Sequence, residues 1–229
     1  MQLYIGNKNY SSWSMRPWVL MRHAGVPFDE VRLRLSFEGD SDFKRRLAAI
    51  TPTGRVPVLV DDGFAVWDTL AIAEYVAEKV QSLPGRPSLW PADARDRARA
   101  RSLCAEMHSG FAALRSHCPM NIEADLPDVG ARLLRDVPEI AVDLARITSM
   151  WQQQLAETGG PFLFGEFSVA DAYFAPVCTR LRTYALPVPE RVRGYVAHML
   201  ELPAVRQWAD EARAEHDFLA FDDPYRAAP

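Results

Sequence analysis

The chain has 229 residues, with 26 Lys and Arg against 30 Asp and Glu, so its formal net charge is −4. Hydrophobic residues make up 48% and charged residues 24%, proportions that suit a globular core and exclude wholesale disorder. This charge balance gives no general electrostatic reason to bind nucleic acid or an anionic membrane. We therefore expect neither among the partners of the protein.

The composition also bears on the compartment. No apolar run reaches the roughly 18 residues of a transmembrane helix, and the first residues lack the basic flank and long apolar segment of a secretory signal. Cys104, Cys118 and Cys178 lie far apart and are odd in number, so they form neither a disulfide framework nor a zinc-ligand pair. These features predict a reduced, cytoplasmic protein without a metal site.

The first 82 residues alternate strand-like and helix-like patterns, which predicts a small α/β domain over 1–82. Asp62-Gly63, between two apolar runs, is a hairpin signal. Pro17 is expected in the first turn of a helix, where its missing N–H is tolerated. In chain order we expect a strand at 3–5, a helix at 14–23, a strand at 31–35, a helix at 41–50, a hairpin at 58–66 and a helix from 69.

A proline-rich stretch separates this domain from the rest of the chain. Pro84, Pro87 and Pro91 fall within 83–91, and no regular element tolerates that density, so we expect a linker there. Strand patterns then vanish, which predicts an all-helical domain over 92–229. Its expected helices are 92–117, 128–157, 170–184, 190–200 and 203–215.

The loop before the first helix carries the first candidate for chemistry. A strand-to-helix loop brings backbone N–H groups and the positive end of the helix dipole together, which favours an anion. Ser11, Ser12 and Ser14 add three hydroxyls at this place. Each of them is also a good helix N-cap, and the chain has no G-x-S-x-G elbow, which argues against a serine hydrolase.

Two further segments suit a peptide-like ligand. Pro57 precedes an apolar strand, and the sequence alone favours a trans Val56–Pro57 bond, because only about 5–6% of X–Pro bonds are cis. A cis bond would present the Val56 backbone to such a ligand. Asp68-Thr69 begins a helix, where a hydroxyl can hold a carboxylate and Asp68 an ammonium, although plain helix capping also explains both residues.

Together these segments resemble the glutathione transferase family, over essentially the whole chain. The segment 11–16, Ser-Ser-Trp-Ser-Met-Arg, resembles the Ser-Ser-Cys-Ser-x-Arg stretch of the zeta class, with Trp13 replacing the cysteine. Positions 56–57 fall at the family's cis-proline, and 68–69 at its Glu/Gln-Ser pair for the γ-glutamyl end of glutathione. Residues 168–171 match its S/T-x-x-D capping box. The resemblance implies a thioredoxin-like N-terminal domain, an all-α C-terminal domain and a homodimer.

The resemblance also implies glutathione as co-substrate, with no metal. Ser11 is the first choice to activate its thiol, because it precedes Arg16 by five residues as the zeta-class serine precedes its arginine, and Ser12 is the alternative. A serine hydrogen bond of about 1.5–3 kcal/mol and a helix N-terminus of about 0.3–1 kcal/mol can together lower a thiol pKa by about two units. The remaining glutathione contacts are expected at Trp13, Arg55, Val56, Pro57, Asp68 and Thr69.

The electrophile pocket is expected between Trp13 and the first long helix of the second domain. A continuous helix would place His108, Phe111 and Arg115 on one face, next to Met107. Met107 and Phe111 are equally well explained as core residues. The Glu-Met-His at 106–108 followed by Leu-Arg also resembles glutathione-dependent maleylpyruvate isomerases, whose dicarboxylate substrates suit an arginine.

Three functions remain open. The first is a glutathione S-transferase, a detoxification enzyme that adds the thiolate to a small electrophile. The second is a glutathione-dependent cis–trans isomerase of the maleylacetoacetate or maleylpyruvate type. The third is a non-catalytic binding or stress protein that keeps the fold.

Overall fold

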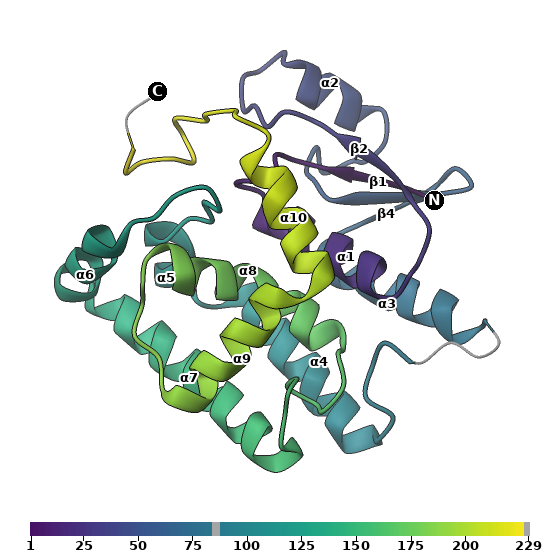
Figure 1. Cartoon of the computed structure of the whole chain (residues 1–229). Coiled ribbons are helices and arrows are strands. Elements are labelled where there is room, and N and C mark those ends of the chain that lie inside the picture. Colours follow the sequence, from purple (N-terminus) through teal and green to yellow (C-terminus); the bar gives the residue numbers. More distant parts are fainter. Residues whose placement is uncertain (84–87, 227–229) are drawn as a thin grey trace.

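The computed structural model describes residues 1–83 and 88–226; within the expected linker 83–91, residues 84–87 lie outside the described part. A mixed sheet with its own helices forms one end of the molecule, and a larger group of helices forms the other (Figure 1). The sheet has four strands in the order β2-β1-β3-β4. In chain order these are β1 (Gln2–Ile5), β2 (Asp29–Arg32), β3 (Val58–Asp61) and β4 (Phe64–Trp67).

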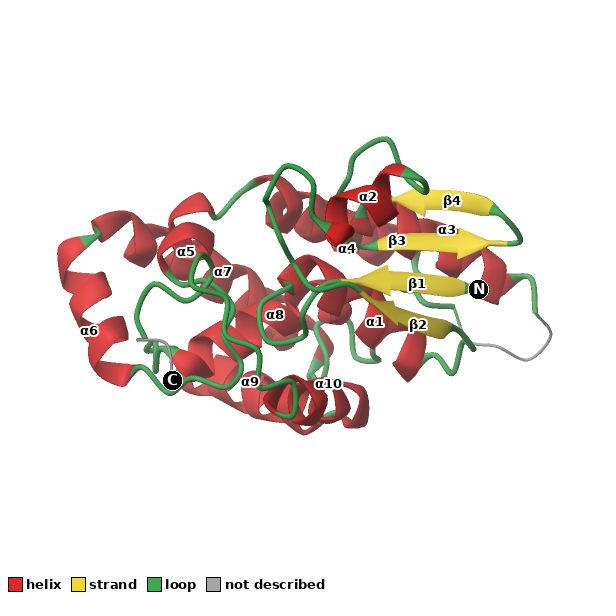
Figure 2. Ribbon diagram, turned by 90° about the horizontal axis from the view of Figure 1, so that it is seen from above, coloured by secondary structure: helices red, strands yellow, loops and turns green. Residues whose placement is uncertain are grey.

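β1 runs parallel to β2 and antiparallel to β3, and β3 pairs with β4 as the expected hairpin (Figure 2). Asp62 and Gly63 both have positive φ, as a two-residue hairpin turn requires. Leu33 lies beyond the end of β2, although its N–H still donates to the Ile5 carbonyl oxygen. The strand and helix order predicted for this region is confirmed.

The alternation of side chains along the strands divides the interior into two cores. Leu3 and Ile5 are fully buried with α1 (Ser12–His23) and α3 (Thr69–Gln81) in the main core. Tyr4 lies between them in sequence and packs in the smaller core, with Phe43 and Leu47 of α2 (Asp42–Ala48). The sheet is therefore covered on both faces.

α1 is the element that joins the two halves of the molecule. It packs on β1 and α3 and also on α8 (Val169–Thr183) and α10 (Pro203–Arg213). The helix begins at Ser12 rather than at 14, because Ser11 is its N-cap. Pro17 consequently lies in the second turn of α1, so its expected place in the first turn is wrong.

Two expected helices are each broken in two. The first, 92–117, is interrupted at Gly110 and at Phe111, which has φ 56°, and the second, 128–157, at Val137-Pro138. Proline lacks the N–H that would continue a helix and restrains the residue before it. The helices observed are α4 (Ala94–Ser109), α5 (Ala112–His117), α6 (Pro127–Asp136) and α7 (Pro138–Thr158).

Within the second half, α8 is buried along nearly its whole length and α9 (Glu190–Glu201) packs beside it. The capping box predicted at the start of α8 is confirmed. The Ser168 hydroxyl accepts from the Ala170 N–H, and Asp171 accepts from the Ser168 N–H at 2.9 Å. Burial raises the pKa of Asp171 to about 6. None of the helices in the described part of the chain is long and apolar enough to cross a membrane.

Candidate active site

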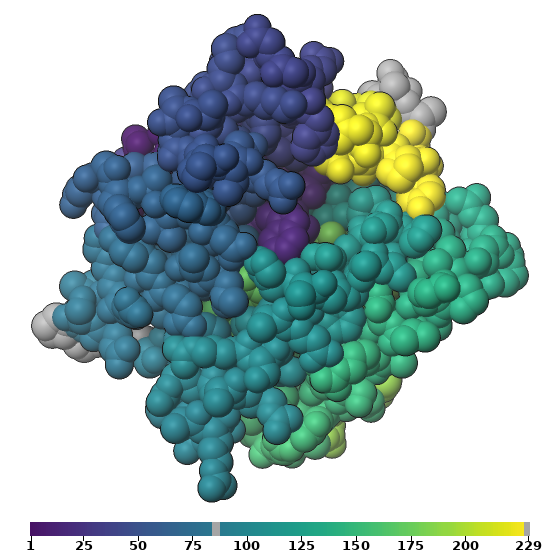
Figure 3. All heavy atoms as spheres, turned by 180° about the vertical axis from the view of Figure 1, so that it is seen from behind, coloured from purple at the N-terminus to yellow at the C-terminus, as the bar shows by residue number. Residues whose placement is uncertain are grey.

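Two adjoining cavities lie between the sheet half and the helical half. The first has a volume of about 470 Å³ and the second about 530 Å³. Trp13, Arg55 and Val56 line both of them, so the two cavities form one groove. Figure 3 shows the surface hollowed here, between the blue atoms of the first half and the teal atoms of the second, with purple N-terminal atoms at the bottom.

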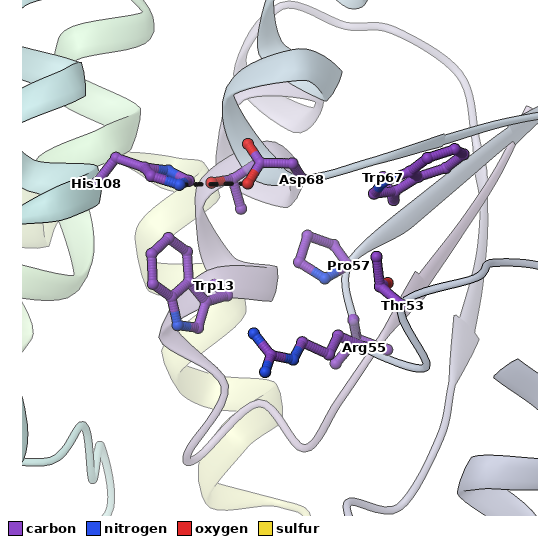
Figure 4. Close-up of a pocket in the computed structure, with 9 residues that line it drawn as sticks. Trp13, Thr53, Arg55, Pro57, Trp67, Asp68 and His108 are labelled. Carbon is purple, nitrogen blue, oxygen red and sulfur yellow. Dashed lines mark ion pairs between the residues drawn. The ribbon is translucent and has the colours of Figure 1, made fainter.

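The first cavity is built around the start of α3. Asp68 is the N-cap of this helix, and its carboxylate accepts from the Leu70 N–H at 2.8 Å. Its backbone has φ 74°, a conformation that non-glycine residues adopt chiefly where the surrounding structure imposes it, as at binding sites. The Asp68 side chain is 45% exposed and lies in the cavity with Trp67 and Thr53, two lining residues that the sequence did not indicate (Figure 4).

A chain of polar contacts connects Asp68 to the helical half. His108 Nε2 lies 3.3 Å from Asp68 Oδ2, and His108 Nδ1 lies 3.3 Å from the Tyr173 hydroxyl. Tyr173 in turn shares a 2.7 Å hydrogen bond with the Thr69 hydroxyl. The Thr69 hydroxyl, expected to meet the ligand, is thus bonded within the protein. The N–H groups of Thr69 and Ala71 at the start of α3 remain as donors for an anion, since that of Leu70 is bonded to Asp68.

The opposite wall of the groove is the loop before β3. The Val56–Pro57 peptide bond is cis, as the family resemblance implied and against the preference of the sequence alone. Arg55, Val56 and Pro57 all line the first cavity, and Arg55 and Val56 continue into the second. In Figure 4, Pro57 and Arg55 face Trp13 across the cavity.

The serine loop lies in the second cavity, at the N-terminus of α1. Ser11 and Ser12 both line it and are both largely buried. Trp13, between the cavities, has the edge of the His108 ring against it, at a centroid distance of 5.1 Å, and the Arg16 guanidinium 4.2 Å from its ring centroid. The helix N-terminus, the hydroxyls and the arginine all favour an anionic ligand atom here.

Arg16 is a buried cation whose Nε and Nη1 atoms have no hydrogen-bond partner among the described residues. Its guanidinium is stacked between the rings of Trp13 and Tyr173, and burial lowers its pKa to about 10, so it stays protonated at neutral pH. The sequence marked Arg16 only as part of the zeta-like motif.

Of the four residues expected around the electrophile, only His108 and Arg115 lie together at the groove: Arg115 Nη1 donates to the His108 carbonyl oxygen at 3.3 Å, and both side chains contact the Trp13 ring. His108 lines the first cavity and Arg115 the second, whereas Met107 and Phe111 are buried in the main core and line neither. The break between α4 and α5 is the reason, since it removes the continuous helical face that would have aligned them. Their interpretation as core residues describes the observed positions of Met107 and Phe111.

Two charged residues of the second cavity, Arg180 and Asp222, were missed. Arg180 is buried in α8 and follows a run of uncharged, mostly apolar residues over 172–179; a charge at the end of that run was an available signal. Asp222 comes from the segment after α10, and no local pattern marks it; burial and the neighbouring Asp223 raise its pKa to about 6. Over residues 1–83 and 88–226 there is no cluster of three or more His, Cys, Asp or Glu side chains that could hold a metal ion.

Comparison with known families decides the affiliation. The model of the glutathione S-transferase N-terminal domain matches residues 10–79, and that of the glutathione S-transferase C-terminal domain matches residues 92–211. The chain belongs to the glutathione S-transferase family. The sheet and helices observed are those of the glutathione transferase fold, with a thioredoxin-like first half and an all-α second half.

The proteins similar to this glutathione S-transferase family member include an isomerase and a transferase homolog. It is 27% identical to the maleylacetoacetate isomerase of Rattus norvegicus over 175 residues, 76% of this chain and 74% of the relative. A glutathione transferase homolog from Burkholderia gl BGR1, solved with bound glutathione, superimposes with a TM-score of 0.68 at 27% identity over 93% of this chain and 98% of its own. A bacterial zeta-class maleylpyruvate isomerase gives the same TM-score at 24% identity, over 94% and 99%, and shares the fold.

Proposed function

We propose that this protein is a glutathione S-transferase that adds the glutathione thiolate to an electrophile in the second cavity. The single observation that carries the proposal is the continuous groove from the N-terminus of α3 to that of α1. The Asp68 carboxylate binds the ammonium group of the γ-glutamyl end of glutathione. The N–H groups at the start of α3 bind the carboxylate of that same γ-glutamyl end. Val56 meets the peptide backbone, Arg55 the second carboxylate, and the serine loop the sulfur.

The groove favours the charged form of the thiol. A free thiol has a pKa of about 8.5, so only a few per cent is thiolate at neutral pH. The α1 N-terminus, a serine hydroxyl and the nearby guanidinium groups of Arg16, Arg115 and Arg180 all stabilise a negative sulfur. The thiol proton leaves to solvent, and the sulfur lone pair then forms the bond to the electrophilic carbon. A halide leaves with its bonding pair, an epoxide C–O bond opens to an alkoxide that takes a proton from solvent, or the π pair of an unsaturated carboxylate moves to the neighbouring carbon, which is then protonated.

The lining of the second cavity supports an anionic, partly apolar electrophile. One wall is apolar, while Arg55, Arg115 and Arg180 contribute three positive charges against the single carboxylate of Asp222. This excess of arginine favours the second candidate, isomerisation of a conjugated dicarboxylate by addition and loss of the thiolate, because guanidinium groups bind carboxylates well. The apolar wall consists of Leu35, Phe37, Phe43, Pro119 and Met120.

Binding and turnover separate these functions. Calorimetry should detect binding of glutathione, and the protein should conjugate members of a panel of aryl halides, epoxides and unsaturated carboxylates. Turnover of maleylacetoacetate or maleylpyruvate without net consumption of glutathione would establish the isomerase instead. Binding without turnover of any of these compounds would leave the non-catalytic role, and a failure to bind glutathione would overturn both the transferase and the isomerase.

The same proposal covers the organisation of the protein. We assign residues 1–82 to the glutathione-binding domain and 92–229 to the helical domain, with a linker at 83–91, in line with the two family matches. We assign the protein to the cytoplasm as a homodimer with a role in detoxification. Light scattering during size-exclusion chromatography tests the dimer, and fractionation of the source cells tests the compartment.

A further inference from the structure

Ser11 and Ser12 are neighbours in the chain, but their hydroxyls have different partners. The Ser11 hydroxyl donates to Ser14 Oγ at 2.7 Å, and Ser11 Oγ also accepts from the Ser14 N–H at 3.4 Å. Ser14 Oγ in turn accepts from the Gly6 N–H. The hydroxyl hydrogen of Ser11 is therefore used within the cap of α1 and is not directed to a ligand.

Ser12 has the opposite arrangement. Its Oγ accepts a hydrogen bond from Nη2 of Arg180 at 3.3 Å, and no acceptor for its own hydrogen lies within bonding distance in the described part of the chain. Ser12 lines the second cavity, at the first residue of α1. Since a hydroxyl has one hydrogen to donate, the hydrogen of Ser12 is available to a group in the groove.

Arg180 is fixed for this contact. Its Nε donates to the Cys118 carbonyl oxygen at 2.8 Å and its Nη1 to the Pro176 carbonyl oxygen at 3.2 Å. No carboxylate forms an ion pair with it among residues 1–83 and 88–226, and its side chain is fully buried. The full positive charge of the guanidinium therefore acts on the Ser12 oxygen, which strengthens the hydroxyl as a donor.

The surroundings leave that charge unbalanced. The groups near Arg180 are the cations Arg16 and Arg115 and the neutral Tyr184 and Cys118. The other titratable groups of the cavity are Tyr10, Arg55 and Asp222. Burial lowers the pKa of Arg180 to about 10, so it keeps its proton across the range in which a thiol titrates.

We propose that Ser12, held by Arg180, donates the hydrogen bond that activates the thiol of glutathione, and that Arg180 is a positioning residue acting through Ser12. The inference rests on the proposed binding of glutathione in this groove. It reverses the order of preference that the zeta-like spacing gave to Ser11, and it adds a residue of α8 from the other half of the molecule.

The test is the thiol pKa of bound glutathione, read from thiolate absorbance against pH at saturating glutathione. Ser12→Ala should raise this pKa by about one to two units, whereas Ser11→Ala should leave it within about 0.3 units. Arg180→Gln should raise it by about one unit, and it should add nothing further in the Ser12→Ala background. Arg182→Gln, an exposed arginine of the same helix, is the matched control and should change nothing.

Because Arg180 is buried, Arg180→Lys provides a charge-conserving variant if the glutamine does not fold; it should give an intermediate pKa. A shift with Ser11→Ala and none with Ser12→Ala overturns the inference. An Arg180 effect that persists undiminished without Ser12 overturns the positioning role, since the charge would then act directly. Wild-type protein that does not bind glutathione overturns the proposed function as well, whereas binding with superimposable titrations overturns this inference alone.

Discussion

Asp68 Oδ2 lies 3.3 Å from His108 Nε2, so the proposed ammonium site on the sheet half is oriented by a side chain of the helical half (Figure 4). The contacts return through the hydroxyl of Tyr173 to Thr69, the next residue in the chain after Asp68. Asp68 and Thr69 are thus connected to each other through His108 of α4 and Tyr173 of α8. This closed set of contacts orients the proposed γ-glutamyl site, and none of its polar contacts involves the serine loop.

Removing the Tyr173 hydroxyl should therefore affect glutathione binding and leave the chemistry unchanged. Tyr173→Phe frees the Thr69 hydroxyl and one nitrogen of His108, so we expect the KM for glutathione to rise about two- to tenfold, the equivalent of one neutral hydrogen bond. The kcat at saturating glutathione should stay within about twofold. Tyr195→Phe, which removes a buried hydroxyl bonded to Asp171, is the control and should leave the KM unchanged. A fall in kcat alone would contradict this account.

Substitution of Asp68 should weaken glutathione binding more than substitution of Tyr173. Asp68→Asn keeps the shape and the cap but removes the charge opposite the ammonium, so glutathione affinity should fall about 10- to 100-fold, as for a hydrogen bond to a charged group. Isothermal calorimetry measures the change directly. Asp62→Asn, at an exposed aspartate of the β3–β4 turn, should bind glutathione as the wild type does. Equal affinities for the Asp68 variant and the wild type would place the ammonium elsewhere.

Local patterns predicted the fold well because its elements are decided by local chemistry. The hairpin at Asp62-Gly63 and the capping box at Ser168 were readable within a few residues. The two helix breaks were missed because helical periodicity continues across them, although Gly110 and Pro138 are local signals for a break. The start of α5 after the first break also has a tertiary contact, from the Leu114 N–H to the Asp143 carboxylate.

The site was less readable, because its decisive contacts are distant in sequence. Sequence spacing favoured Ser11; the two serines are distinguished by the bond of Ser11 to Ser14 and by the contact of Ser12 with Arg180, which is 168 residues away. The loop at Asn7, Lys8 and Asn9 also depends on distant contacts, because its polar side chains are buried in the structure. Its partners include Glu211 of α10 and Glu215 and Asp217 after that helix, all distant in sequence.

Replacing Lys8 tests how much the ion pairs of this loop contribute to stability. The Lys8 ammonium is 2% exposed, pairs with Glu30 at 2.7 Å and with Glu211, and lies over the rings of Trp18 and Trp208. Lys8→Met keeps the stem but leaves two carboxylates facing each other. We expect a loss of roughly 2 kcal/mol in urea unfolding, below the ~3–5 kcal/mol of a fully buried pair because Glu211 is 41% exposed.

The control for this measurement is Lys44→Met, whose ammonium donates to the exposed Phe37 carbonyl oxygen. It should change the unfolding free energy by less than about 0.5 kcal/mol. Adding Glu211→Gln to Lys8→Met should restore part of the loss, because it removes one of the opposed charges. A Lys8→Met protein as stable as the wild type would show that the cation contributes no net stability.

Asp222 should make the binding of anions in the second cavity depend on pH. Its pKa is raised to about 6 by burial and by Asp223, so it is neutral well below pH 6 and negative above. An anionic group in the cavity is repelled only by the negative form. Its affinity should therefore fall as pH rises through 6, by about threefold, the interaction of unit charges roughly 6 Å apart in water.

Two glutathione conjugates isolate this effect from every other titration. S-carboxymethylglutathione carries an extra carboxylate that is ionised above about pH 5, and S-methylglutathione does not; neither has a free thiol. The ratio of their dissociation constants, the methyl over the carboxymethyl compound, should be about three times higher at pH 5 than at pH 7.5 in the wild type. In Asp222→Asn it should stay at the higher value throughout, because no charge appears at that position. A wild-type ratio that is flat with pH, or a slope that survives in Asp222→Asn, would mean that Asp222 does not face the bound anion.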